Sequence, residues 1–478
     1  MAISTLTTWE VRPTNGNDTN GGGFVQGSTG TDYSQQNAKN SGGNNGSTTD
    51  AVANGTTTIT SASASFTSAL VGNIIYLSGG SGSLAADRYE VKTFTNSTTI
   101  VVDRNVATGT GITMNIGGAL KTLSQLNTSM NAVNGNSAWV KAESTITTAS
   151  TITFIFTGAS SAQQPAVKGY ATTRGDGGKV TIQVSSSTGD AIVNINSAGL
   201  SFENFILDGN SKSSQRGLIL NTTGCRAVSV DVKNCTNVYG IELDGNYCSA
   251  VDCTVTGQGG SSGSHGAFRF SGVIPVFLGC VAYGNSVGGF VAASSQGSIH
   301  INCIAANNSG ASSDGFFVGG AQPGCTLFLM GCVAYANGRG GIRFSVGQQS
   351  TFQFRNTITY GNSGWGINQI TSTIPAGTLY ADYNAYGSNT SGNLSGISAG
   401  AHDQTLSGDP FTNGAGNVFT LNSTAGAGAA CRAAGFPSLS TFGTGYPDIG
   451  ALQHQDAGGS TTYVIAQNRT QVVLEGEI

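Results

Sequence analysis

The chain has 478 residues, a net charge of −4 and 72 glycines, and only 9% of its residues are charged while 38% are apolar. This apolar share is enough to build a core, and the low charge argues against a disordered acidic or basic chain. The 20 lysines and arginines form no cluster, so we expect no nucleic-acid partner.

The chain start has neither the basic nor the apolar region of a secretory signal. The longest apolar run, near residues 273–283, is far shorter than the ~18 residues that a membrane span needs. We therefore expect no membrane association and synthesis in the cytoplasm. The nine cysteines show no zinc spacing, and we predict neither a metal site nor a cofactor.

The first 116 residues are predicted to be rich in strands. Residues 9–13 suggest one strand, and alternating runs at 56–60, 73–77 and 98–102 predict a small β-domain. Residues 15–21 lack the alternating acids and the distal Glu of a calcium loop, so we interpret them as an Asn/Gly turn.

Residues 117–135 show helical spacing. Their apolar positions recur every three or four residues, at Leu120, Leu123, Leu126, Met130 and Val133. Strand-like segments follow near residues 138–140 and 151–156. We predict a helix that caps the first coil of a solenoid.

An internal repeat is visible in similar segments that begin at Cys280, Cys303 and Cys332, and a fourth begins at Thr357. Extending the comparison gives intervals of 22 to 29 residues between coil starts at Asn204, Asp231, Cys253, Cys280, Cys303, Cys332, Thr357 and Asp382. A period in the twenties indicates a solenoid. Leucine-rich repeats share this period, but these coils lack their leucine frame and helical backs. We predict a right-handed parallel β-helix over residues 136–400.

Coils stacked ~4.8 Å apart should place like residues in columns. A turn column is predicted five residues after the coil start, at Asn285, Asn308, Asn337 and Asn362, where each amide can bond its neighbour. A second column, Cys280, Cys303 and Cys332, is predicted to point inward, buried and unbridged.

The segments after the last coil carry a resemblance. The order Gly408-Asp409-Pro410-Phe411, then 418–421, then 447–451 resembles the C-terminal closing segment of pectin-lyase-like right-handed β-helix proteins. Residues 9–24 with Gly117-Gly118-Ala119 resemble the start of β-helix proteins of bacteriophage virions. This architectural resemblance covers nearly the whole chain and implies a tail spike, a tail fibre, a capsid decoration protein or a polysaccharide-cleaving enzyme. It also implies a homotrimer.

We predict that residues 401–458 close the β-helix and that residues 459–478 form an assembly tail. The tail follows a Gly-Gly-Ser break and alternates weakly. Such a strand is expected to pair with a neighbouring protomer or another virion protein.

Candidate catalytic residues are few. Glycosidases use two carboxylates, about 5 Å apart for retention or roughly 6.5–9.5 Å for inversion. Between residues 254 and 381 the only acidic residue is Asp314, so that stretch offers no pair. Upstream, Asp208, Asp231 and Asp252 are spaced by about one coil and are the candidates, with ordinary turn aspartates as the alternative.

Other mechanisms have less support. A pectate-lyase-like site would need clustered acids for calcium and a base, and only Arg216 and Arg226 lie nearby, with no lyase motif around them. The histidines, which occur in separate contexts and predict no Ser-His-Asp triad, are His265, His300, His402 and His454. We interpret His300 as a residue of the solenoid wall.

An aromatic strip is the candidate glycan-binding feature. Its members lie on consecutive or nearby coils: Tyr283, Tyr335, Tyr360 and Trp365. Aromatic residues at equivalent coil positions also form core stacks, so both interpretations stay open.

Two functions follow from the sequence. We favour a non-enzymatic structural or adhesive virion protein, which contacts other virion proteins and the host surface polysaccharide. The alternative is a polysaccharide-degrading tail-spike depolymerase, either a glycosidase or a lyase. A bacterial surface protein is a third hypothesis and would need an oxidising compartment.

Overall fold

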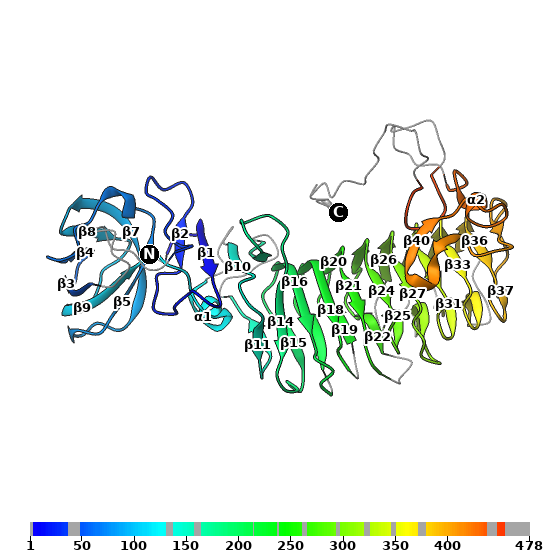
Figure 1. The fold of residues 1–478 in the computed structure, drawn as a ribbon, viewed down its shortest axis with the longest axis horizontal. Coiled ribbons are helices and arrows are strands. Elements are labelled where there is room, and N and C mark those ends of the chain that lie inside the picture. The colour runs from blue at the N-terminus through cyan, green and yellow to red at the C-terminus, as the bar shows by residue number, and fades with distance from the viewer. Residues whose placement is uncertain are drawn as a thin grey trace.

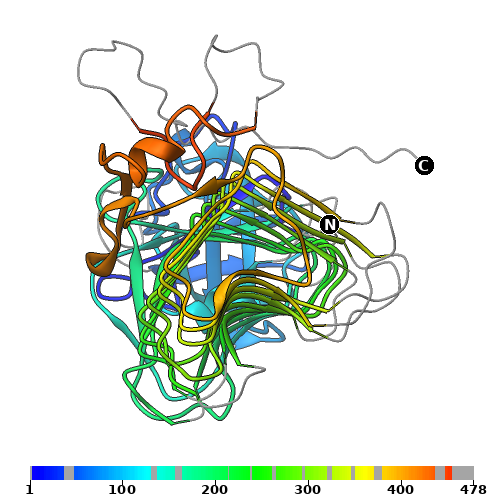
Figure 2. The ribbon, with the colours of Figure 1, turned by 90° about the vertical axis from the view of Figure 1, so that its right-hand side faces the viewer.

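Short β-branched runs between Gly and Asn fold into a right-handed parallel β-helix, as the repeat predicts. The computed structural model describes residues 3–36, 48–130, 137–156, 164–213, 215–236, 239–260, 265–292, 297–319, 326–345, 350–370, 379–436 and 447–454. A small barrel-like domain stands at the N-terminal end of the stack (Figure 1). Figure 2 looks along the stack, with the coils one behind another.

Each regular coil contributes two strands to a long sheet and one strand to a second sheet. Within the described residues the long sheet has 21 strands. They are β1 (Thr7–Val11), β2 (Gly23–Val25), β10 (Ser137–Lys141), β11 (Ile146–Thr148), β13 (Ala166–Tyr170), β14 (Val180–Val184), β16 (Ser201–Asp208), β18 (Arg226–Lys233), β20 (Ser249–Val251), β21 (Thr254–Thr256), β23 (Val276–Leu278), β24 (Val281–Tyr283), β26 (Gly297–Ile301), β27 (Ile304–Ala306), β29 (Thr326–Met330), β30 (Val333–Tyr335), β32 (Thr351–Arg355), β33 (Ile358–Tyr360), β35 (Leu379–Asp382), β36 (Ala385–Gly387) and β38 (Gln404–Thr405).

The second sheet has ten strands within the same described residues, paired in parallel from coil to coil. They are β12 (Ile152–Phe154), β15 (Ala191–Ile195), β17 (Arg216–Leu220), β19 (Tyr239–Leu243), β22 (Gly266–Phe270), β25 (Gly288–Ala292), β28 (Asp314–Val318), β31 (Gly340–Phe344), β34 (Trp365–Gln369) and β37 (Gly392–Ser395).

A left-handed residue bends the chain between the two long-sheet strands of a coil. This bend column has φ between 51° and 62° at Asp252, Gly279, Asn302, Gly331 and Asn356. Gly, Asn and Asp occupy it because they adopt a positive φ at lower cost than other residues. The column marks the border between the two strand rows of the long sheet.

The cysteine column follows the bend directly and is confirmed. Cys280, Cys303 and Cys332 are fully buried, and Cys253 precedes them in register. All eight cysteines within the described residues are free and buried. Each column thiol contacts a carbonyl of the preceding coil, as Cys280 Sγ does with Ala250 O at 3.3 Å.

Some predicted coil starts are wrong by one or two positions. The strand register places Phe205, Val230 and Asn384 in the cysteine column. The predicted starts Asn204, Asp231 and Asp382 lie beside that column instead. Without a cysteine to mark the column, the neighbouring bend and strand residues are similar enough to shift the comparison.

The asparagine ladder is confirmed and extends by one coil. Its four Nδ2–Oδ1 hydrogen bonds measure 2.8–3.0 Å and join Asn285, Asn308, Asn337, Asn362 and Asn389 in series. Each interior amide also donates to a carbonyl of the preceding coil, as Asn337 Nδ2 does to Ala305 O at 3.0 Å. The ladder therefore satisfies buried polar groups on every rung.

The predicted cap is present as a shorter helix, α1 (Leu123–Ser129). Thr122 caps its N-terminus by accepting from the Gln125 N–H at 3.0 Å. Leu123 and Leu126 enter the solenoid core, which confirms the capping role. Leu120 lies before the helix and forms a bridge with Val11, so its apolar spacing reflects a strand contact.

The interior of the stack is rich in aromatic rings. Phe290 stacks between Phe268 and Phe316 at centroid distances of 4.7 and 4.9 Å. His300, expected in the wall, lies inside, where its ring stacks on Phe277 at 4.7 Å. Burial lowers the pKa of His300 to about 3, so this histidine is uncharged at neutral pH.

Among the described N-terminal residues, seven strands form an antiparallel sheet with its own core. It consists of β3 (Thr48–Ala53), β4 (Thr58–Thr60), β5 (Ile74–Ser78), β6 (Ser81–Gly82), β7 (Asp87–Asn96), β8 (Thr99–Val102) and β9 (Gly109–Ile116), with the 3-10 turn η1 (Ser68–Leu70). The strand predicted near Trp9 is β1, which pairs with β10 and so belongs to the solenoid sheet.

A closing segment covers one strand row of the long sheet near the C-terminal end (Figure 1). It contains β39 (Phe411–Asn413), η2 (Gly414–Gly416), β40 (Val418–Leu421) and α2 (Gly428–Cys431). Its apolar side chains, among them Phe411, Phe419 and Ile449, pack with Val333 and Ile358 on the outer side of that row. The predicted tail, residues 459–478, lies outside the described residues.

A buried polar cluster joins β1 to β13 and to the turn that follows β13. Glu10 on β1 is fully buried, accepts a hydrogen bond from the Tyr170 hydroxyl and lies 2.9 Å from Arg174 Nε. Burial raises the pKa of Glu10 to about 7, and Arg174 opposes that shift only in part.

This raised pKa predicts a pH dependence. A carboxyl whose folded pKa exceeds its unfolded value binds more protons when folded, so its contribution is full below pH ~4.5 and is lost as pH rises through about 7. We expect the loss to reach about 3 kcal/mol. His300 contributes the opposite slope, so the readout is the difference in denaturant midpoint between wild type and Glu10→Gln. A constant difference from pH 4.5 to 8 would contradict the assignment.

Candidate functional site

The predicted catalytic aspartates do not form one column. Asp208 ends β16 and pairs in register with Lys233, whereas Asp231 pairs with Ile206, two positions earlier. Burial acts to raise the pKa of Asp208, but hydrogen bonds from the Asn210 N–H, Asn234 and Gln183 outweigh it and hold that pKa below its usual value. Asp208 is therefore a charged, well-bonded residue at a strand end.

Asp231 and Asp252 lie near one lysine. Lys179 Nζ is 2.7 Å from Asp231 Oδ2. Asp252 occupies the bend column, where burial raises its pKa and Lys179 partly counteracts the shift. The structure thus brings these two aspartates toward Lys179 and leaves Asp208 apart.

The predicted aromatic strip is divided between sheets and partly covered. Tyr335 and Tyr360 stack at 6.1 Å in the long sheet, in the same strand row as Tyr283. Tyr335 is only 7% exposed, because Phe411 and Phe419 of the closing segment pack against its ring. Trp365 lies on β34 of the second sheet. The four rings therefore do not share one open surface.

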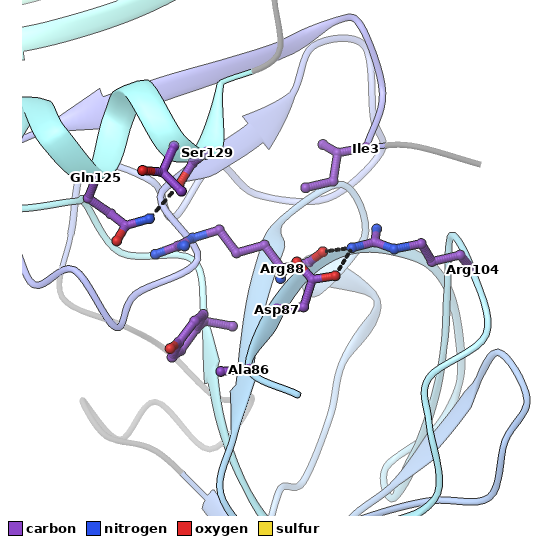
Figure 3. A pocket seen from close by; sticks show the side chains of 9 residues that line it. Ile3, Ala86, Asp87, Arg88, Arg104, Gln125 and Ser129 are labelled. Atoms are coloured by element: carbon purple, nitrogen blue, oxygen red, sulfur yellow. Dashed lines mark hydrogen bonds and ion pairs between the residues drawn. The ribbon is translucent and has the colours of Figure 1, made fainter. Parts of the chain in front are cut away.

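A cavity of about 510 Å³ lies between the barrel and α1 (Figure 3). Most of the polar side chains that line it already form hydrogen bonds or ion pairs with other groups of the protein. Arg104 Nη2 is 2.8 Å from Asp87 Oδ2, and Gln125 Nε2 donates to Ser129 Oγ at 2.9 Å (Figure 3). Arg88 donates to the carbonyl oxygens of Asp18 and Asn20. We interpret this cavity as the joint between the barrel and the solenoid.

Two arginine–carboxylate clusters on the second sheet form a better candidate. The first, the Glu242 cluster, comprises Glu242 and Tyr239 on β19, Arg216 on β17 and Arg269 on β22. The Glu242 side chain is 4% exposed, lies 3.3 Å from Arg216 Nη1 and accepts from Arg269 Nη1. Both guanidinium groups also flank the Tyr239 ring, at 5.5 and 4.5 Å from its centroid.

Burial shifts the pKa values of two residues at this cluster, Glu242 and His265. It raises the pKa of Glu242, while Arg269 and Arg216 oppose the shift. His265 meets the Tyr239 ring edge-on at 5.8 Å, and burial together with Arg269 lowers its pKa. Burial and the Arg269 charge therefore both disfavour the protonated form of this imidazole.

The second group, the Asp314 cluster, repeats the same composition. It comprises Asp314 and Phe317 on β28, Arg343 on β31 and Arg339 just before β31. The Asp314 side chain is fully buried; Arg339 Nε is 3.0 Å from both of its oxygens, and Arg343 Nε is 2.8 Å from Oδ2. The Arg343 guanidinium lies 4.1 Å from the Phe317 ring centroid.

The register aligns both clusters on one face. Glu242, Arg269, Val291, Phe317 and Arg343 pair in succession along the second sheet. Each cluster has two arginines around one buried carboxylate, and Asp190, 3.6 Å from Arg216, balances the remaining positive charge of the Glu242 cluster, so the surplus charge lies on the Asp314 cluster. The arginine side chains remain 20–34% exposed. This arginine face can therefore offer N–H donors to an anion from outside.

A pair of acidic residues also lies here. Arg216 Nη1 is 3.6 Å from Asp190 Oδ1 and 3.3 Å from Glu242 Oε2, so these oxygens lie within about 7 Å of each other. Asp190 is 47% exposed, whereas Glu242 is buried with a raised pKa. This contrast is what a glycosidase needs between its two carboxyl groups.

The sequence matches no protein-family model and no curated protein. Solved structures that resemble it include Geobacillus virus E2 ORF18, at 11% identity and a TM-score of 0.38, over 60% of this chain and 58% of that one. The likeness is one of fold. Pectate lyase Pel9A matches at 15% identity and a TM-score of 0.43, over 70% and 92% of the two chains. A mannuronic acid specific family 6 polysaccharide lyase from human gut microbiota matches at 11% identity and a TM-score of 0.35, over 59% of this chain and 76% of that one.

No described helix is both long enough and apolar enough to pass through a bilayer. Nor do His, Cys, Asp and Glu residues gather in threes at a potential metal site anywhere in the described ranges.

Proposed function

We propose that this protein is a rod-shaped structural and adhesive component of a bacteriophage virion, of the tail spike, tail fibre or capsid decoration type. Its arginine face would bind an acidic polysaccharide of the host surface. The observation that carries the binding role is the repeated cluster of two partly exposed arginines, one buried carboxylate and one aromatic ring. The virion assignment, with a homotrimer that contacts other virion proteins, rests on the sequence resemblance.

Carboxylate or sulfate groups on a glycan suit this face better than a nucleic-acid backbone does. A protein that tracks DNA neutralises many phosphates, whereas the two clusters together have a small net positive charge. Tyr239 and Phe317 add ring surfaces beside the guanidinium groups, which fits a sugar polymer that combines apolar ring faces with spaced charges.

The test compares polyuronate, dextran sulfate, neutral dextran and duplex DNA in affinity electrophoresis. Two variants remove a whole cluster each without leaving a buried carboxylate unpaired: Arg216→Ala/Glu242→Gln/Arg269→Ala and Asp314→Asn/Arg339→Ala/Arg343→Ala. Lys121→Ala, which is exposed and remote on the chain, makes the same net charge change of −1 and serves as the control.

Combining both cluster variants should weaken binding to the acidic glycan at least ten-fold, while Lys121→Ala should change it less than two-fold. Added salt should also weaken the wild-type interaction. Equal binding to neutral dextran, preference for DNA, or unchanged binding by the combined variant would refute the proposal.

A depolymerase is the second candidate, favoured by the Glu242 and Asp190 pair. The protein would then shorten host capsular polysaccharide, which size-exclusion chromatography detects. Glu242→Gln and Asp190→Asn should each abolish shortening but retain binding. Shortening that persists in both variants would exclude this pair as the catalytic carboxyls.

A further inference from the structure

The long sheet carries an uncovered apolar surface. It consists of six outward side chains in two registered columns, which we call the apolar stripe: Val276, Ile299 and Phe328 in one, and Leu278, Ile301 and Met330 in the other. All six are partly exposed, and none belongs to the apolar core clusters of the described residues. Contiguous apolar surface of this kind marks an interaction site.

In the neighbouring strand row, a similar outward apolar surface is covered by another part of the chain. Across the bend column, Ile304 and Val333 lie on two of the stripe coils and Ile358 lies one coil further, and all three point outward and are buried. The closing segment buries them with Phe411, Phe419, Leu421 and Ile449. The apolar stripe is therefore the half of the same face that lacks this cover among the described residues.

Gly450, near the end of the described residues, lies at the border of the stripe. The Gly450 N–H donates to Asn356 O at 2.8 Å, and the Gly450 carbonyl oxygen lies 3.3 Å from the position of a Cβ on Gly331. Gly331 follows Met330, the last member of the stripe. Gly450 is four residues before the last described residue, His454, so the segment that follows begins within reach of the stripe. Ten extended residues would span about 33 Å, several times the coil spacing.

We propose that residues 459–478 pack on the apolar stripe of their own chain. This segment has two apolar groups, 463–465 and 472–474, followed by Glu475 and Glu477. If it runs back along the stack, its acidic end approaches Arg226, two coils beyond Val276 in the same register. The stripe strands are already paired on both sides, so the segment binds through side chains and not by strand addition.

The first test measures how fast a protease removes the tail. Phe328→Glu should speed that cleavage at least ten-fold, because a charge in the middle of the stripe opposes apolar packing. Gln353→Glu is the matched control, since Gln353 lies one coil further in the same column and outside the stripe. Equal cleavage rates in the two variants would overturn the proposal.

The second test needs no destabilising change. A photoreactive phenylalanine analogue at Tyr463 in the full chain should cross-link to peptides from residues 276–330, within one molecule. Isotope-mixed protein distinguishes links within a chain from links between chains. Links only between chains would make a second copy the occupant, and links that avoid the stripe would show that the tail binds elsewhere. Either result would refute the proposal.

Discussion

Replacing Asn337 by leucine is expected to lower the free energy of unfolding by about 2–4 kcal/mol, the cost of leaving buried polar groups unpaired. The Asn337 side chain is fully buried. It donates to Ala305 O and Asn362 Oδ1, each at 3.0 Å, and accepts from Asn308 Nδ2 at 2.9 Å. Leucine has a similar length but removes all three bonds, and its branched end must fit against Gly315.

The denaturant midpoint provides the measurement, with Asn308→Leu as a second interior rung. Asn221→Leu is the control, because Asn221 is exposed at the end of β17. The control should differ from wild type by less than about 0.5 kcal/mol. Unchanged midpoints in both interior variants would show that the ladder contributes nothing to stability.

The sequence was sufficient to predict the fold where identical residues mark the register. Asparagine and cysteine recur at equivalent positions of several coils, because a turn that needs an amide and an interior that needs a small side chain impose the same choice on each coil. The predicted register was wrong at Asp231 and Asp382. In those two coils Val230 and Asn384 occupy the cysteine column, so no cysteine marks it.

The candidate site was harder to predict, because its contacts join residues of adjacent coils. Asp314 and Arg339 are 25 residues apart, and Glu242 and Arg269 are 27 apart. Coil lengths vary, so such spacings do not show which outward side chains face each other. One signal was present: Asp314 is the only acid between residues 254 and 381, and two arginines follow it by about one period.

The aromatic strip illustrates a second limit. Repeat spacing correctly aligned Tyr335 with Tyr360. Whether an outward ring is open depends on segments distant in sequence, and the closing segment near Phe411 covers Tyr335. Periodicity predicts whether a side chain points into or out of the solenoid. It cannot predict which outward side chains are covered by another segment of the chain.

Removing both arginines of the Asp314 cluster should destabilise the solenoid strongly. Arg339→Ala/Arg343→Ala leaves the Asp314 carboxylate fully buried without its ion-pair partners, which typically costs about 3–5 kcal/mol. Asp314 starts β28, and its backbone pairs with Gly340 in the second sheet, so the strand holds the carboxylate at this position.

Adding Asp314→Asn to that variant should recover most of the loss, since a neutral amide is far less costly to bury than an unpaired charge. Denaturant midpoints of the wild type, the double variant and the triple variant at pH 7 measure this recovery. If the triple variant is as unstable as the double variant, packing of the arginine stems, and not the buried charge, determines stability at this cluster.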